Sequence, residues 1–395
     1  MDGTKRRRSH HVLMLPSWYP TETAPHSGIF FRDQARAVAS NDMLVGTLFP
    51  ETRSLRSLRV VSPLKNRWQV VENQDHGVSM MGIAGWNLGA RVLRKAAYLL
   101  GVRKLAAKYV ATYGLPTVIH GQSTFWGGVA AAELSARFDI PYVITEHSSA
   151  FPRGLVTPAE RHAADQALKR AGAVVAVSRY LADVLAAEFG DLGIRVIPNI
   201  VDSPFFDRPV IDRSESRSLL AVAALVPNKR VDKILRAFAM AFPDENVILQ
   251  IVGQGPLAKG LRLLAGQLGV STRVAFLGSM DRAALLRVME ASLAVVSASE
   301  IETFGLALAE AQALGVPVIA TPSGGPADII LPSTGILAES DVHSLASSMR
   351  EIYQNKDMWS EQSKRIREAA LERFHPAAVS ARLTQLYDDV ARQVT

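Results

Sequence analysis

Two glutamates eight residues apart form the most informative pattern in this sequence. Glu302 follows an apolar run typical of a strand, and Glu310 lies inside the helix expected after it. Backbone amides at a helix start attract phosphate, and a regular helix places the two glutamates about 12 Å apart at a rise of roughly 1.5 Å per residue. A carboxylate accepts paired hydrogen bonds from neighbouring hydroxyls, so this span suits a diphosphate with a sugar at one end and a ribose at the other. The residues expected at the helix start are Phe304, Gly305 and Leu306.

A second interpretation of Glu302 and Glu310 is that both are surface residues, because the helix dipole favours acids near a helix start. The glycines that follow them favour a ligand site. Gly324 and Gly325 come directly after the next apolar run, where a tight turn lets the backbone approach a ligand.

Two cations stand at the start of another expected helix, which we place at residues 229–242. Lys229 and Arg230 would lie in its first turn, where a positive charge opposes the helix dipole. A bound anion would reverse the sign of that effect, so the pair indicates an anion site, and two solvated cations are the alternative. Gly253 opens a glycine loop after the next strand pattern, a weak signal for which a plain turn is the alternative.

The first half of the chain carries glycine and polar residues at the ends of two expected strands. Gly28 follows the first strand and precedes a helix. Glu146 and His147 end a later strand, so we expect both side chains to emerge at a ligand cleft, with a structural role as the alternative for the histidine. Trp18 and Tyr19 either line an acceptor site or pack in the domain core.

Short apolar runs alternate with longer helical periods along the whole chain, which is the pattern of parallel sheets covered by helices. The 395 residues fit two doubly wound domains facing a central cleft, where the carboxyl ends of the strands bind ligands. We expect an N-terminal domain at 1–203, a C-terminal domain at 204–374, and a terminal helix at 375–395 that returns to the first domain. The expected strands begin at His11, Met43, Pro116, Pro141, Ala173 and Ile194 in the first half, and at Leu219, Val247, Arg273, Leu293 and Pro317 in the second.

Composition excludes several kinds of site. The chain has no cysteine, which rules out disulfides, thiol catalysis and zinc fingers. No apolar run is long enough for a signal peptide or a membrane span, so we expect a cytoplasmic protein, either free or peripheral at the inner face of the cell membrane. The formal net charge is +7, and a helix expected from Arg91 carries six basic residues and no acid. That helix fits an anionic membrane surface, an anionic acceptor or a solvated face, and no nucleic-acid-binding motif accompanies it.

These motifs resemble those of glycosyltransferase family 4, and the resemblance extends from His11 to about Gln393. It implies a GT-B fold, in which two Rossmann-like domains face a central cleft, and retention of anomeric configuration. In that family the first glutamate contacts the transferred sugar, the second contacts the nucleotide ribose, and a lysine holds the donor diphosphate. The resemblance implies these roles for Glu302, Glu310 and Lys229.

The resemblance reaches further positions. Gly28 matches a glycine loop that closes over the donor phosphate, and His147 matches a histidine that contacts the donor sugar near the reacting centre. Ala224 replaces the family's usual diphosphate arginine, and Arg230 stands where glycine is more common, so we expect Arg230 to substitute for it. The catalytic candidates are His147, Glu302 and Lys229; the donor-binding candidates are Gly28, Lys229, Arg230, Gly253, Phe304, Gly305, Leu306 and Glu310; the acceptor-side candidates are Trp18, Tyr19 and Glu146.

The expected function is that of a retaining hexosyltransferase, which moves a sugar from a UDP- or GDP-sugar to an acceptor hydroxyl in cell-surface polysaccharide or glycolipid biosynthesis. The acceptor would be a glycan, a lipid-linked molecule or a small molecule. The sequence has no Asp-x-Asp pair, so we expect no metal and no cofactor besides the co-substrate. The alternatives are a non-catalytic partner subunit that binds nucleotide sugar, which Ala224 would favour, and a GT-B nucleotide-sugar epimerase.

Overall fold

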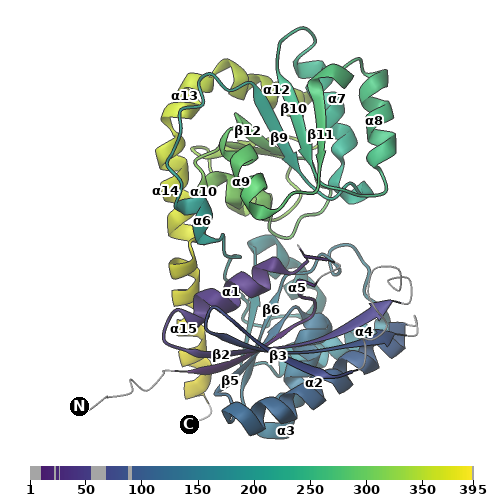
Figure 1. The fold of residues 1–395 in the computed structure, drawn as a ribbon, viewed down its shortest axis with the longest axis vertical. Helices are drawn as coiled ribbons and strands as arrows, with labels where there is room; N and C mark the ends of the chain where they lie inside the picture. The colour runs from purple at the N-terminus through teal and green to yellow at the C-terminus, as the bar shows by residue number, and fades with distance from the viewer. Residues whose placement is uncertain (1–9, 22–23, 26, 55–67, 88–90, 394–395) are drawn as a thin grey trace, which may run out of the picture. The chain divides into compact units, whose positions relative to one another are not determined.

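The structure, a computed structural model, describes residues 10–21, 24–25, 27–54, 68–87 and 91–393. It divides into two compact units, each described below by itself (Figure 1). Unit 1 comprises Met1–Val177, Ala182–Ile200 and Val379–Thr395, and unit 2 comprises Ser178–Leu181 and Val201–Ala378. The terminal segment therefore belongs to the same unit as the first half of the chain.

Unit 1 is built on an eight-stranded sheet in the order β3-β4-β2-β1-β5-β6-β7-β8. All neighbouring strands are parallel except β3 and β4. The apolar run of β1 is buried because it lies at the centre of this sheet, with Val12 paired to both Val45 and Val118. The strands are β1 (His11–Pro16), β2 (Leu44–Ser54), β3 (Val70–Asp75), β4 (Val78–Asn87), β5 (Val118–Gln122), β6 (Tyr142–Glu146), β7 (Ala173–Ala176) and β8 (Arg195–Val196).

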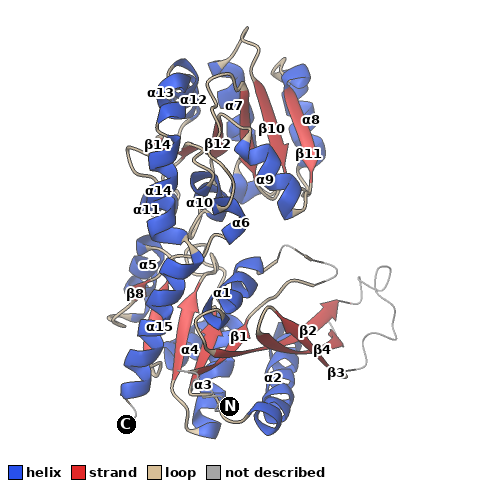
Figure 2. Ribbon diagram, turned by 60° about the vertical axis from the view of Figure 1, so that its left-hand side comes forward, coloured by secondary structure: helices blue, strands red, loops and turns tan. Residues whose placement is uncertain are grey.

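Helices cover both faces of this sheet (Figure 2). They are α1 (Ile29–Ala39), α2 (Arg91–Tyr113), α3 (Val129–Phe138), α4 (Pro158–Lys169), α5 (Arg179–Phe189) and α15 (Pro376–Arg392). α15 packs into the unit 1 core because its apolar residues recur at helical spacing: Val379, Leu383, Leu386, Tyr387 and Val390 are all buried there. The expected return of the terminal helix to the first domain is confirmed.

Unit 2 is built on a six-stranded parallel sheet in the order β11-β10-β9-β12-β13-β14. The strands are β9 (Ser218–Val222), β10 (Ile248–Val252), β11 (Val274–Gly278), β12 (Ala294–Ser297), β13 (Val318–Ala320) and β14 (Gly335–Leu337). The helices are α6 (Ser203–Phe206), α7 (Val231–Ala241), α8 (Ala258–Gln267), α9 (Arg282–Glu290), α10 (Leu306–Ala313), α11 (Pro326–Ile329), α12 (Val342–Gln354), α13 (Lys356–Glu361) and α14 (Ser363–Phe374).

Each sheet has one point where the strand order reverses direction. In unit 1 it lies between β1 and β5, and in unit 2 it lies between β9 and β12. Loops that leave the carboxyl ends of the two strands at such a point diverge to opposite faces of the sheet, which leaves a crevice for a ligand. A ligand site is therefore expected at the loops after these four strands.

Candidate functional site

Loops from three neighbouring strands meet at the carboxyl edge of the unit 2 sheet. The loop after β9 joins the loop after β12 through the backbone N–H of Glu300, which donates to the carbonyl of Asn228 at 2.8 Å. The loop after β12 joins the loop after β13, because the Glu302 N–H donates to the Ser323 carbonyl at 2.9 Å and the Gly325 N–H donates to the Glu302 carbonyl at 2.8 Å. Backbone bonds thus fix this edge on both sides of the β9/β12 reversal point.

Lys229 and Glu302 face each other across this reversal point. The Lys229 ammonium donates a hydrogen bond to Oε2 of Glu302. Their side chains are 26% and 20% exposed, so both are accessible to a ligand while water is largely displaced from around them. The structure thus brings together two residues that lie 73 positions apart and that the sequence assigned to one ligand.

Arg230 lies beside Lys229, but its surroundings differ from the expected ones. The short helical turn Pro227–Lys229 ends before it, and Arg230 caps α7 in the left-handed region at φ 44°. Lys229 and Arg230 therefore precede the helix and do not occupy its first turn, because the left-handed residue separates the two helical segments. A left-handed conformation is also a physical reason why glycine suits this position. The Arg230 guanidinium binds two carboxylates, those of Asp232 and Glu300.

α10 begins at Leu306, shortly after Glu302 and Phe304. Its cap is Gly305 at φ 100°, a conformation that side chains rarely adopt, and no side chain caps the helix start. The amides of the first turn, from Leu306 on, therefore remain without a side-chain cap. Glu310 lies one turn further along α10 and is 7% exposed.

Gly253 also lies close to the loop after β9. Its φ is 143°, and a Cβ built on it would lie 1.9 Å from the Ala223 carbonyl oxygen. The neighbouring Gln254 carbonyl accepts from the N–H of Leu225 at 2.9 Å. Glycine is required at 253 for this close backbone approach, and that requirement explains the residue whether or not a ligand binds there.

In unit 1, Gly28 ends the loop after β1 and caps α1 at φ 69°. A Cβ at this position would lie 2.8 Å from the Trp18 side chain, so the loop is packed against that ring. Trp18 is half-buried and contacts Phe30 and Phe31 edge to face, whereas Tyr19 is only 5% exposed. Packing in the core accounts for Tyr19, and Trp18 keeps an accessible edge.

Glu146 is buried at the end of β6, whereas its side chain was expected to emerge at a cleft. Its carboxylate accepts backbone hydrogen bonds from Thr124 at 2.9 Å, from His147 at 2.8 Å and from Ser148 at 2.6 Å. These three bonds tie the loop after β5 to the loop after β6. Such bonds occupy the carboxylate, so Glu146 acts here as a fixed part of the unit 1 edge.

His147 is also buried, and both of its ring nitrogens have partners. Nδ1 lies 2.9 Å from Oδ1 of Asn199, and Nε2 lies 2.9 Å from Oε1 of Gln122. A neutral imidazole donates to one neighbour and accepts from the other, whose amide then presents its nitrogen. Phe30 stacks on the ring at 5.1 Å between centroids. The expected contact of His147 with a donor sugar stays a prediction.

The network of buried polar side chains around His147 continues at a second histidine, His120. His120 lies on β5, with Nδ1 2.8 Å from the Tyr387 hydroxyl and Nε2 2.7 Å from the Thr145 hydroxyl. Gln122, His120 and Tyr387 were not among the site residues predicted from the sequence. Polar residues inside the buried run VIHGQ of β5 were the available signal, because an apolar strand core rarely contains them without partners.

Burial lowers the pKa of both His120 and His147 to about 3. An unfolded histidine takes up its proton near pH 6.5, so between these values the unfolded chain binds more protons than the folded one. We therefore expect the free energy of unfolding to fall as the pH falls below 6.5, by about 1.4 kcal/mol per pH unit for each histidine. Urea unfolding of wild type and of His147→Gln between pH 6.5 and 4.5 measures this slope.

In His147→Gln the free energy of unfolding should change less steeply with pH, by an amount that corresponds to about one proton fewer taken up on unfolding. The matched control is His343→Gln, which removes an exposed histidine and should leave the wild-type slope unchanged. An equal slope in His147→Gln and wild type would contradict the burial of a neutral imidazole.

The basic face of α2 is largely engaged within unit 1. Arg103 pairs with Glu133, and Lys108 pairs with Glu72 at 2.6 Å. The Lys104 ammonium donates to the Trp68 carbonyl at 3.1 Å, and the Lys95 ammonium lies 4.9 Å from the centre of the Trp126 ring. These contacts neutralise or occupy much of the charge, and contact with a membrane surface stays a prediction. No helix in the described ranges is long and apolar enough to cross a bilayer.

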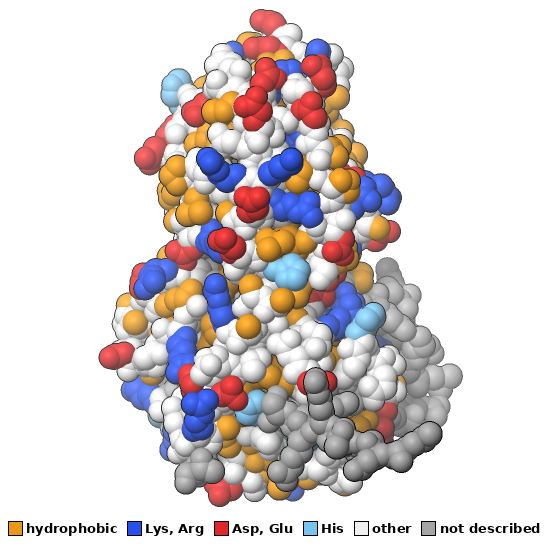
Figure 3. Space-filling view, turned by 90° about the vertical axis from the view of Figure 1, so that its left-hand side faces the viewer, with side chains coloured by type: hydrophobic (Ala, Val, Ile, Leu, Met, Phe, Trp, Pro, Cys, Tyr) orange, Lys and Arg blue, Asp and Glu red, His pale blue; other side chains and the backbone are white. Residues whose placement is uncertain are grey.

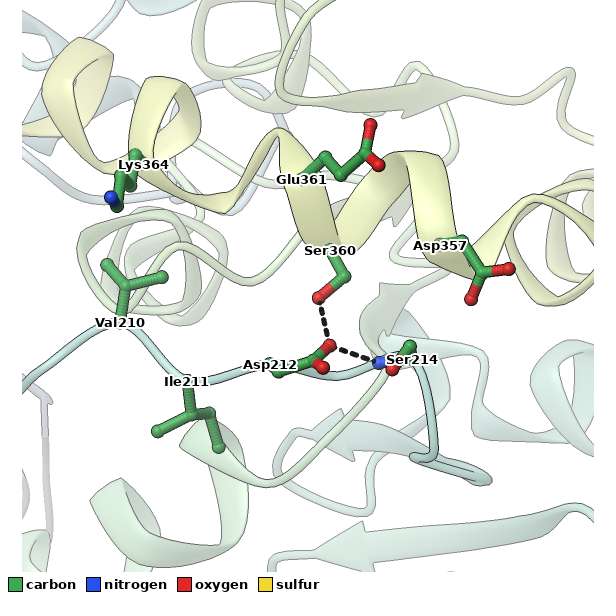
Figure 4. Close-up of a pocket in the computed structure, with 8 residues that line it drawn as sticks. All are labelled: Val210, Ile211, Asp212, Ser214, Asp357, Ser360, Glu361 and Lys364. Atoms are coloured by element: carbon green, nitrogen blue, oxygen red, sulfur yellow. Dashed lines mark hydrogen bonds between the residues drawn. The ribbon is translucent and has the colours of Figure 1, made fainter.

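A cavity of about 620 Å³ lies in unit 2 on the side away from the sheet edge that carries Lys229 (Figure 4). It is formed by the segment that leads into the amino end of β9 and by α13 and α14; Asp212 accepts there from the Ser360 hydroxyl at 2.7 Å. The Lys229 edge is at the carboxyl end of the same strands, so this cavity is separate from it.

Among the described residues, no group of three His, Asp or Glu side chains is arranged to hold a metal ion. Acidic and basic side chains are intermixed over the face drawn in Figure 3.

Comparison with known proteins gives two family matches that adjoin each other. Residues 64–204 match the profile described as Glycosyltransferase Family 4, and residues 204–373 match Glycosyl transferases group 1. A curated relative, N-acetyl-alpha-D-glucosaminyl L-malate synthase of Bacillus anthracis, is 32% identical over 182 residues. That match covers 45% of this chain and 47% of the relative, so the chain matches about half the length of that protein.

Solved structures with the same fold cover nearly the whole chain. Sucrose-phosphate synthase from Thermosynechococcus elongatus superposes with a TM-score of 0.76 at 21% identity, covering 97% of this chain and 100% of that one. HepE of Anabaena in complex with UDP superposes with a TM-score of 0.73 at 19% identity, covering 96% and 99%. At these identities the likeness shows the fold, and the fold is GT-B.

Proposed function

Because this chain belongs to glycosyltransferase family 4, we propose that it transfers a hexose from a nucleotide diphosphate sugar to an acceptor hydroxyl. The observation that carries the proposal is the meeting of Lys229 and Glu302 at the β9/β12 reversal point, next to the start of α10, which no side chain caps. Lys229 and the amides of α10 supply positive potential for a diphosphate. Glu302 and Glu310 supply acceptors for sugar and ribose hydroxyls.

We assign the transfer a retaining, front-face course. The bond from the anomeric carbon to the diphosphate oxygen breaks, the acceptor oxygen bonds to that carbon on the same face, and the acceptor proton passes to the leaving diphosphate. Lys229 and the α10 amides stabilise the negative charge that develops on the diphosphate, which is the usual contribution of preorganised electrostatics. In this course Glu302 and Glu310 orient the donor and no protein carboxylate forms a covalent intermediate.

A panel of UDP-, GDP-, ADP- and dTDP-sugars tests the donor half of the proposal by thermal shift and calorimetry, because a bound ligand raises the apparent stability. One nucleotide class should bind far more tightly than the others. Consumption of the bound sugar without an acceptor, with a new sugar epimer as product, would identify an epimerase. Tight binding with no turnover toward any acceptor would favour a non-catalytic subunit, and no binding at all would refute the proposal.

We expect full activity in excess EDTA, because Lys229 and the helix amides take the place of a divalent cation at the diphosphate. The measurement is the initial rate of transfer with and without chelator, once a donor and an acceptor are known. A loss of turnover that added Mn²⁺ restores would show that a metal takes part.

A further inference from the structure

Two side-chain ion pairs, and not one, connect the loops after β9 and β12. Lys229 binds Glu302, and one residue further along the first loop Arg230 binds Glu300, with Nη1 2.6 Å from Oε1. Beside these pairs, the Asn228 side-chain amide donates to the Ile301 carbonyl at 2.9 Å. Residues 228–230 are thus attached to residues 300–302 by both backbone and side-chain contacts.

The Arg230 guanidinium is already bound through all three of its nitrogens. Nε and Nη2 contact the two carboxylate oxygens of Asp232 at 3.1 and 3.0 Å, and Nη1 contacts Glu300. The hydrogen bonds that Arg230 donates to Asp232 and Glu300 raise the pKa of its guanidinium. To bind this guanidinium, a diphosphate would have to displace one of the two carboxylates. Phosphate and carboxylate groups are both anionic and accept paired hydrogen bonds from arginine in a similar geometry, so they compete for the same donors. Lys229 has a single carboxylate partner, which the donor itself engages in the proposed function.

We propose that Arg230 and Glu300 are positioning residues that hold Lys229 and Glu302 in register for the donor, and that Arg230 does not bind the diphosphate. The proposal rests on the proposed function, since Lys229 and Glu302 are its donor residues. It accounts for a bulky cation at a left-handed position where glycine fits more easily. It also implies that the place of the missing arginine at Ala224 is not filled by Arg230.

Calorimetry of UDP and GDP binding to Arg230→Gln, Glu300→Gln and the double variant separates the two roles. If Arg230 binds the diphosphate directly, Arg230→Gln should weaken binding, whereas Glu300→Gln should free Nη1 of Arg230 and leave the affinity equal or higher. A positioning pair loses affinity equally on either substitution, and the double variant loses no more than each single one. We expect roughly a twofold to fivefold rise in Kd, because the pair is partly exposed to solvent.

The controls exclude a general effect of lost charge. Arg236→Gln removes an exposed arginine from the same helix and should leave Kd unchanged. Arg230→Lys retains the cation and should recover part of the affinity. Glutamine at 230 keeps a side chain at the left-handed position, so the backbone strain is the same in wild type and variant.

A second readout needs no nucleotide and therefore remains informative if the proposed function fails. The rate at which an amine-reactive ester labels Lys229 in the free protein, followed by mass spectrometry, reports how firmly its ammonium is held against Glu302. Both Arg230→Gln and Glu300→Gln should label Lys229 several-fold faster than wild type, with Lys259 as the internal reference. An unchanged labelling rate, or tighter nucleotide binding in Glu300→Gln, would overturn the positioning role. Absence of UDP and GDP binding in wild type would count against the donor assignment alone.

Discussion

Replacing Lys229 with methionine should lower the rate of sugar transfer by roughly 10²- to 10³-fold, the usual effect of removing one preorganised group that stabilises a developing charge. The charge on the leaving diphosphate is greatest in the transition state, so the loss should appear in kcat at saturating donor as well as in kcat/KM. Methionine keeps an unbranched side chain of nearly the same length and removes the ammonium. The measurement is the steady-state rate with the donor found in the nucleotide panel.

Lys259→Met is the matched control for that experiment, because it removes an exposed lysine from α8 in the same unit. It should leave kcat within the error of wild type. Lys229→Met also leaves Glu302 without its cation, so thermal unfolding of the ligand-free protein must accompany the kinetics. A folded Lys229→Met variant with a kcat near that of wild type would remove Lys229 from the mechanism.

Glu310→Ala should weaken nucleotide binding by roughly 10- to 100-fold. A carboxylate that binds ribose hydroxyls makes charge-assisted bonds worth about 1.5 to 3 kcal/mol each, and alanine leaves those hydroxyls unpaired in the bound state. The effect should be nearly equal for the nucleoside diphosphate alone and for the complete nucleotide sugar, because the ribose is common to both. Calorimetry with the two ligands measures this equality.

The control for Glu310→Ala is Glu351→Ala, which truncates an exposed glutamate on α12. It should bind the nucleotide like wild type. Glu302→Ala offers a further contrast, since it should weaken the nucleotide sugar more than the nucleoside diphosphate. A Glu310→Ala variant that loses affinity only for the sugar-bearing ligand would exchange the roles assigned to the two glutamates.

The strongly patterned parts of the chain are well predicted from sequence. The expected strand starting at Leu219 is β9, and the expected 229–242 helix is α7, whose buried Val231, Ile234, Leu235 and Phe238 keep a helical spacing. β3, β4 and β14 were not expected. The residues of β3, Val70–Asp75, are largely polar and exposed, as befits an antiparallel edge strand. Its structure depends on pairing with β4 and is not visible in its own composition.

The residues of the candidate site likewise divide into those that could be predicted from the sequence and those that could not. Lys229 and Glu302 could be assigned from their places after two strands, because parallel sheet geometry brings such ends to one edge. The burial of Glu146 and His147 could not be read from their position at a strand end. It depends on Thr124, Gln122 and Asn199, which arrive from distant parts of unit 1. The left-handed Arg230 likewise depends on the tertiary pairing with Glu300.

The membership of α15 in unit 1 has a consequence for how the chain acquires its structure during synthesis. Val379, Leu383 and Tyr387 fill the unit 1 core, and the Tyr387 hydroxyl contacts His120, some 267 residues earlier. The ribosome therefore synthesises all of unit 2 before it synthesises the part of α15, from Val379 on, that completes unit 1. Until α15 is synthesised, part of the unit 1 core stays exposed to solvent. Unit 2 is almost continuous in the sequence, so it can fold while it is being synthesised. The unit that is translated first therefore receives the last part of its core only after unit 2 has been synthesised.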